Sequence, residues 1–130
     1  MKTSEIISEF LAFLRQAVID CGNASSMERQ ANEQTQDIMH KLELCKCGYH
    51  ERAKLATLLV NVRQNRRAVK NTYEVLHPIS EWMTINAHIY HSLERLLGEV
   101  RKAEEKQQNK MYLPRTSIVD FPKEDATDDT

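Results

Sequence analysis

The stretch "ISEWMTINAHIYHSLERLLGEVRKA", residues 79–103, carries the most regular pattern of the sequence. Its seam side chains, all apolar except Asn86, recur at spacings that alternate between three and four residues, which is typical of helices packed lengthwise against each other. Pro78 precedes the stretch and suits the first turn of a helix, where no backbone N–H is needed. The pattern therefore predicts a helix over residues 79–107. The seam consists of Ile79, Trp82, Asn86, Ile89, Leu93, Leu96, Val100 and Ala103.

The preceding segment, residues 49–76, predicts a second long helix. Apolar side chains return there every seven residues, as expected for a helix with one buried row. The link between the two helices is only His77-Pro78, which is too short for anything except an antiparallel hairpin. We therefore expect Val62 to face Leu93 across this hairpin. The repeating row consists of Leu55, Val62, Val69 and Leu76.

The N-terminal third is apolar but less regular. Gly22 and a capping-box pattern, Ser25 three residues before Glu28, predict that one helix ends and another begins near residues 22–26. The alternative is one continuous helix of about 40 residues. Together these patterns predict an all-α fold, an antiparallel helical bundle or coiled-coil hairpin of three to four helices. Their expected ranges are 4–21, 26–45, 49–76 and 79–107.

The composition fits one helical domain followed by a tail. The chain has 130 residues, of which 41% are hydrophobic and 28% charged, and it contains three glycines and three prolines. So few turn-forming residues argue against an all-β fold. We assign residues 1–108 to the helical domain. Residues 109–130 are rich in acidic side chains and lack a repeat, which predicts an extended or disordered acidic tail.

The sequence gives no indication of a membrane or secretory protein. No segment has the roughly 20 consecutive apolar residues that a membrane-spanning helix needs. No secretory signal is recognisable, and three cysteines suggest no disulfide framework. We therefore expect a cytoplasmic protein without membrane contact.

Cys45, Cys47 and His50 lie close together in the sequence and raise the question of a metal or redox site. A structural zinc ion needs four ligands, and the expected helices hold the other histidines and Cys21 too far away to supply the fourth. Gly48 suits a tight connection between two helices. We therefore favour a turn over a metal site, with a Cys-x-Cys disulfide as a further alternative. We expect no metal, no cofactor and no catalytic residue.

The segment "NVRQNRRAVK", residues 61–70, concentrates positive charge on the expected 49–76 helix. If the apolar row faces the hairpin, these side chains form a connected stripe that points outward. Such a stripe is often only a solvated face, but it also suits an acidic protein partner or nucleic-acid phosphates. A formal net charge of −1 and the lack of aromatic residues among the arginines favour the protein partner. The basic stripe comprises Arg52, Arg63, Arg66, Arg67 and Lys70.

The 4–21 segment has more apolar surface than one packed face can hide. Two sets of apolar side chains occupy different faces of this helix, so folding back onto the bundle would leave one set exposed. A two-fold dimer would cover both sets with the same residues from each chain. We therefore expect a homodimer. The predicted self-association residues are Ile6, Ile7, Phe10, Leu11, Phe13, Leu14 and Val18.

Two stretches resemble a group of small helical proteins of bacteriophages and prophages of Gram-positive bacteria. They are "YHERAKLATLLVNVRQNRRAVKNTYEVLHPISEW" (49–82) and "NKMYLPRT" (109–116), and the resemblance extends over residues 36–116. It brings no catalytic motif, and it implies an accessory protein that binds host or phage macromolecules. We therefore expect a non-enzymatic protein–protein interaction module, a phage- or prophage-encoded regulator or inhibitor. The alternative is an accessory nucleic-acid-binding protein that uses the basic stripe.

Overall fold

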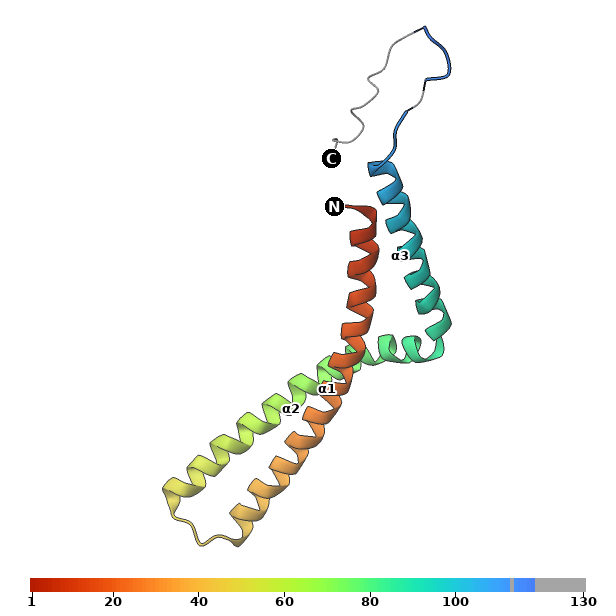
Figure 1. Ribbon diagram of the computed structural model, residues 1–130. Helices are drawn as coiled ribbons and strands as arrows, with labels where there is room; N and C mark the ends of the chain where they lie inside the picture. The colour runs from red at the N-terminus through yellow and green to blue at the C-terminus, as the bar shows by residue number, and fades with distance from the viewer. Residues whose placement is uncertain (113, 119–130) are drawn as a thin grey trace. The chain divides into compact units, whose positions relative to one another are not determined.

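The computed structural model describes residues 1–112 and 114–118, and these residues contain three α-helices and no strand. Helix α1 spans Thr3–Leu44, α2 spans Tyr49–Ile85 and α3 spans Ala87–Gln108 (Figure 1). The predicted all-α class is confirmed. None of these helices is long and apolar enough to cross a membrane, as far as the described residues go.

The predicted acidic tail is described only in its first part. Residues 110–112 and 114–118 belong to no helix or strand. The prediction for the remainder, residues 113 and 119–130, lies outside the described residues. Among the described residues the helical part therefore ends with α3, and the extended or disordered tail stays a prediction.

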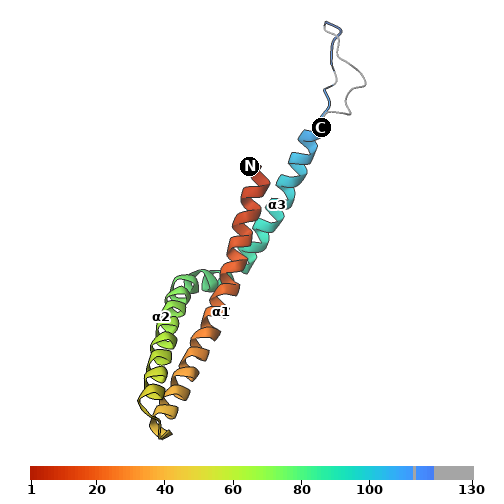
Figure 2. The same cartoon turned by 90° about the vertical axis from the view of Figure 1, so that its left-hand side faces the viewer.

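The chain forms two compact units. Unit 1 combines the start of the chain, Met1–Leu11, with the described residues from His88 onward, and unit 2 comprises Ala12–Ala87. In unit 1 the first turns of α1 lie beside α3, and in unit 2 the rest of α1 lies beside α2 (Figures 1 and 2). Both pairs are antiparallel. Unit 1 thus joins two segments that are far apart in the sequence, whereas unit 2 is a local hairpin.

The predicted helix break near residues 22–26 is wrong, because α1 is one helix of 42 residues. Cys21 and Ala24 are both buried, so the inward-facing stripe continues through the expected break. A Cβ on Gly22 would meet nothing within 4 Å, which places this glycine on the outer side of the helix. Gly22 therefore destabilises the helix only through its low helix propensity, by roughly 1 kcal/mol relative to alanine. The predicted separate helices 4–21 and 26–45 are both parts of α1, so the alternative of one continuous helix is correct.

The predicted turn at His77-Pro78 is also wrong, because α2 continues through Pro78 to Ile85. A proline inside a helix removes one backbone hydrogen bond. Side-chain contacts run along the helix past this point: the rings of Tyr73 and His77 stack at 5.0 Å, and His77 Nε2 lies 3.4 Å from Glu81 Oε2. The neighbouring side chains at 76, 77, 79 and 80 are half-buried, so packing holds the helix together on both sides of the proline.

The interruption falls at Asn86 instead. This residue has φ −112° and ψ 36°, outside the helical range, and both its backbone N–H and its side-chain amide donate to the carbonyl of Trp82, at 2.8 and 3.0 Å. Asn86 thus caps the end of α2 and is not the polar member of a seam. The predicted 79–107 helix is divided between α2 and α3. The predicted facing pair Val62 and Leu93 falls in different units.

The predicted seven-residue spacing is correct for the row on α2 and correct only in part for the seam on α3. The predicted row of Leu55, Val62 and Val69 is half-buried throughout. In α3 the predicted positions Leu93 and Val100 are half-buried, but Ile89 and Leu96 are exposed, and the buried residues directly follow these two. One row with a period of seven then continues through both helices. It consists of Leu55, Val62, Val69, Leu76, Met83, Tyr90, Leu97 and Glu104.

Candidate interaction surface

Unit 1 combines a small core with a polar contact between α1 and α3. Leu11 is only 2% exposed, and it is the most deeply buried large side chain among the described residues. Tyr90 and Leu97 of α3 are buried as well. At the far end of the pair, the backbone N–H of Ser4 donates to Glu104 Oε2 at 3.0 Å. These residues fix α1 and α3 in an antiparallel register.

The Ser4–Glu104 contact also has an electrostatic role. Ser4 lies in the first turn of α1, whose N–H groups lack partners within the helix and attract negative charge. Hydrogen bonds from the Ser4 side chain and then its backbone lower the pKa of Glu104, assisted by the nearby charges of Lys2 and Arg101, while partial burial opposes the shift. The ionised carboxylate of Glu104 therefore caps the start of α1.

Large apolar side chains remain exposed on unit 1. Phe10 of α1 is 52% exposed and Leu96 of α3 is 44% exposed. Each directly precedes a buried leucine, Leu11 or Leu97, so each is rotated about 100° around its helix from the buried line. The same relation holds for Ile6 before half-buried Ile7 and for Ile89 before buried Tyr90. We call these exposed residues the apolar face: Ile6, Phe10, Ile89 and Leu96.

The apolar face lies on one side of unit 1. In an antiparallel helix pair, equal rotations away from the contact line bring residues of both helices to the same side. The opposite side is polar, because Glu5 and Ser8 of α1 line one shallow hollow together with Arg101 of α3. Unit 1 is therefore a two-helix layer with one apolar and one charged side.

The predicted self-association residues divide into two groups. Leu11 and Leu14 are buried within the chain itself, and Ile7 and Val18 are half-buried. The chain therefore covers one of the two apolar faces expected on the 4–21 segment. The second face remains open to solvent. Its members Ile6, Phe10 and Phe13 are 56%, 52% and 54% exposed.

The basic stripe is not uniform. Arg66 faces the hairpin: its Nε donates to Asn32 Oδ1 at 2.8 Å, and its guanidinium lies 3.3 Å from Glu28 Oε2. Glu28 and Asn32 are one turn apart on α1, so Arg66 fastens α2 to α1. The expectation that Arg66 points outward is therefore wrong. The other four members are exposed on α2: Arg52, Arg63, Arg67 and Lys70.

The loop between α1 and α2 brings two cysteines together. The sulfur atoms of Cys45 and Cys47 are in contact. The Cα atoms of these residues are 5.3 Å apart, a separation typical of disulfide-forming residues. His50 lies in the first turn of α2. Within the described part of the chain, no three His, Cys, Asp or Glu side chains are grouped so that they could hold a metal ion.

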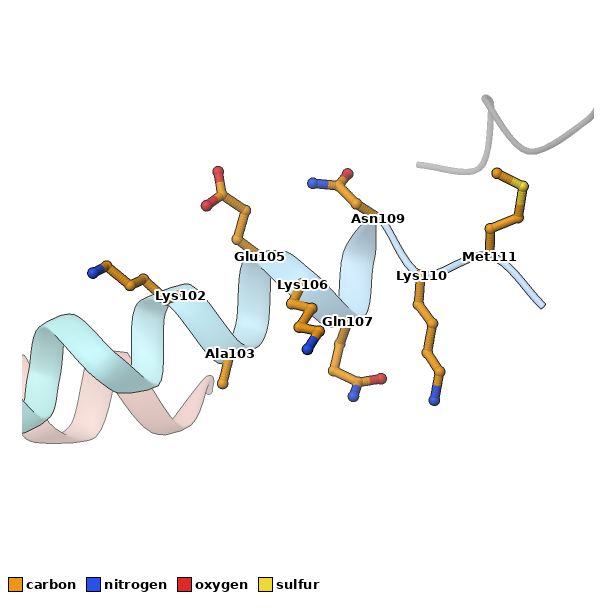
Figure 3. Close-up of a pocket in the computed structure, with 8 residues that line it drawn as sticks. All are labelled: Lys102, Ala103, Glu105, Lys106, Gln107, Asn109, Lys110 and Met111. Atoms are coloured by element: carbon orange, nitrogen blue, oxygen red, sulfur yellow. The ribbon is translucent and has the colours of Figure 1, made fainter. Parts of the chain in front are cut away.

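Two further polar sites lie on α3 and beside its end. His91 Nδ1 lies 2.9 Å from Glu94 Oε1, an exposed pair on one helix face. A hollow beside the end of α3 is lined by charged side chains, but Lys102, Glu105 and Lys110 point away from one another (Figure 3). Catalysis by acid–base or nucleophilic groups requires side chains that converge on a substrate. The hollow in Figure 3 does not provide such a set.

Comparison with known proteins does not extend this description. No family model matches the chain, and no curated protein or solved structure matches it.

Proposed function

We propose that this chain is a non-enzymatic interaction protein that works through the apolar face of unit 1, and that its first partner is a second copy of itself. The observation that carries the proposal is the one-sided distribution of side chains on the α1–α3 pair. Phe10 and Leu96 lie on one side, while Glu5 and Arg101 lie on the other. A two-helix layer with these two sides resembles half of a four-helix bundle.

The apolar face is large enough to need a cover. Four apolar side chains that are each about half exposed leave several hundred Å² of apolar surface, at the upper limit for a soluble monomer. A two-fold axis through this face would set Phe10 and Leu96 of one copy against the same residues of the other. Leu11, Tyr90 and Leu97 lie directly beneath, so the new interface would continue the existing core.

Such a dimer is consistent with a regulator or inhibitor that binds another protein. Dimerisation would use the apolar face and leave the charged side of unit 1 and the exposed arginines of α2 available for a partner. The resemblance of residues 49–82 to small phage and prophage proteins points to the same class of protein.

The test is the molar mass in solution. We expect the wild-type chain of 15.1 kDa to sediment as a dimer at micromolar concentration. The double variant Phe10→Glu with Leu96→Glu should sediment as a monomer, because four carboxylates would meet in the dimer interface. Leu14→Glu is unsuitable, since Leu14 is buried and a charge there would unfold the helix pair.

The matched control is Val60→Glu with Val75→Glu. Both valines are exposed on α2, at 53% and 72%, and lie outside unit 1. This variant receives the same added charge and should remain a dimer with unchanged helicity. A monomeric wild type, or a control variant that dissociates equally, would contradict the proposed interface.

A second candidate function is nucleic-acid binding by the basic stripe. Four exposed basic side chains on α2 favour it, namely Arg52, Arg63, Arg67 and Lys70. Binding through phosphates would weaken linearly with the logarithm of salt concentration. Mobility shifts of DNA and RNA at low salt, with Arg63→Ala and Arg67→Ala as variants, distinguish this function from protein binding. No shift with the wild-type chain would remove it.

A further inference from the structure

The α1–α2 loop contains a pair of cysteines that the interaction surface does not use. The loop has only four residues, Cys45–Gly48, between the end of α1 at Leu44 and the start of α2 at Tyr49. Cys45 and Cys47 are half-buried and in contact, whereas Lys46 between them is exposed. Neither cysteine is fully buried, so both residues keep some contact with solvent at this end of the hairpin.

The two cysteines differ in their electrostatic surroundings. Cys45 directly follows α1, and its N–H donates to the carbonyl of Lys41 at 3.0 Å, so it lies at the negative end of that helix. Cys47 directly precedes Gly48, the N-cap of α2, where no side chain caps the helix. The free N–H groups of a helix start stabilise an adjacent anion. By chain position, Cys47 is therefore next to the helix end that favours an anion, and Cys45 is next to the end that disfavours it.

From this arrangement we infer that Cys45 and Cys47 form a reversible thiol–disulfide couple that exchanges with low-molecular-weight disulfides of the glutathione type. Cys47 is the attacking residue and Cys45 the resolving residue. The contact between the two side chains provides the geometry for an intramolecular disulfide, and the opposite helix ends provide the division of roles.

The exchange proceeds in two balanced steps. The Cys47 thiolate attacks one sulfur of glutathione disulfide, forms a mixed disulfide and releases glutathione thiolate, which takes up the proton that Cys47 gave up. The Cys45 thiolate then attacks the Cys47 sulfur, forms the Cys45–Cys47 bond and releases the second glutathione. Two electrons and two protons pass from the protein to glutathione disulfide, which becomes two glutathione thiols.

Cys21 supplies the internal comparison. It is only 4% exposed on the inner stripe of α1, so it should remain unmodified in the folded chain. The experiments therefore use the full chain with Cys21→Ser, after circular dichroism has shown that its helicity matches the wild type. Any thiol reaction then reports on the loop alone.

The test equilibrates this chain in glutathione buffers of varied composition, followed by acid quenching, alkylation and intact mass measurement. We expect one oxidised species that lacks two hydrogen atoms, and a fraction oxidised that follows the ratio of glutathione disulfide to the square of glutathione. Adding Cys45→Ser should trap glutathione on Cys47. Adding Cys47→Ser should slow glutathione attachment about fivefold relative to Cys45→Ser.

Each result has a definite meaning. If the chain forms no intramolecular disulfide at any glutathione ratio, the couple does not exist. If the Cys47→Ser chain reacts as fast as the Cys45→Ser chain, the assignment of Cys47 as the attacking residue is wrong. Both variants change one sulfur to oxygen in an exposed loop, so unchanged helicity ensures that reactivity is compared between folded proteins. The outcome is independent of the dimer proposal, because the loop lies outside unit 1.

Discussion

The two units of this protein pack the same long helix in different ways. In unit 2 the buried side chains of α1 include three small ones, Ala17, Ala24 and Ala31, and the partner helix is tethered by a four-residue loop. In unit 1 the core is built from larger side chains, Leu11 and Leu97 among them, and the partner helix comes from the other end of the chain. The Ser4–Glu104 hydrogen bond joins residues 100 positions apart.

This difference indicates where each unit obtains its stability. Closing a long loop costs more conformational entropy than closing a short one, so unit 1 must recover more from its side chains. Small residues contribute little burial each, and unit 2 instead gains from its short connection and from the Arg66 contacts. We therefore expect unit 1 to depend on a few large residues, and unit 2 to depend on many small contributions.

The largest expected effect comes from Leu11→Ala. Leu11 is the best-buried large residue of unit 1, and truncation of such a leucine costs about 3 kcal/mol. Hydrogen exchange measured residue by residue should show that α3 loses protection while α2 in unit 2 loses much less. The matched control is Leu58→Ala, a half-exposed position on α2, which should cost under about 1 kcal/mol. Equal loss of protection in both units would refute the difference between them.

A smaller effect is expected from Arg66→Ala in unit 2. The guanidinium is only 24% exposed and contacts both Glu28 and Asn32, so its loss should lower the free energy of unfolding by about 1 kcal/mol. Urea denaturation measures this change. Arg67→Ala, at the exposed neighbouring position, should alter the stability by no more than about 0.5 kcal/mol. A control variant as unstable as Arg66→Ala would argue against the contact with α1.

The smallest effect concerns acid. Because the folded state lowers the pKa of Glu104, the unfolded chain binds a proton more readily at this site. The resulting stability is fully present above the ordinary pKa of glutamate and is lost as the pH falls through the lower, folded value. We expect the protection of the Ser4 amide, its exchange rate relative to that of an unstructured peptide at the same pH, to fall over this acidic range in the wild type. In Glu104→Gln the protection should already be lower at neutral pH and depend less on pH, and identical profiles would contradict the capping role.

The fold was predictable to the extent that one row of side chains repeats every seven residues. Leu55, Val62 and Val69 were placed correctly because apolar residues at this spacing have few other positions to occupy. The second row was misplaced in part, because both Leu96 and Leu97 are apolar and hydrophobicity alone does not tell which of two neighbouring leucines faces inward. Glu104 also belongs to the inward-facing row, but a pattern of apolar residues cannot identify a charged member.

The helix boundaries were harder to predict because local signals compete with packing. Gly22 and Pro78 are both helix-breaking residues in isolation, yet α1 and α2 pass through them, since each costs at most a few kcal/mol against the burial on either side. Asn86 ends α2 through its own side-chain amide, a capping role that the seven-residue pattern concealed. The predicted self-association residues include Ile6 and Phe10 of the apolar face but not Ile89 and Leu96, because the seven-residue pattern assigned these two to a buried seam.

The row from Leu55 to Glu104 also constrains how this protein can change in length during evolution. Deletion of a single residue from α2 would turn every later member of the row within α2 by about 100° and bring its neighbour into the core. Deletion of seven residues restores the row. Matched losses of seven residues from facing parts of α1 and α2 would shorten the unit 2 hairpin by about 10 Å and leave the remaining facing residues in register. Viable length variants of this chain should therefore differ by multiples of seven within the helices, and insertions of other sizes should fall in the loop at Cys45–Gly48.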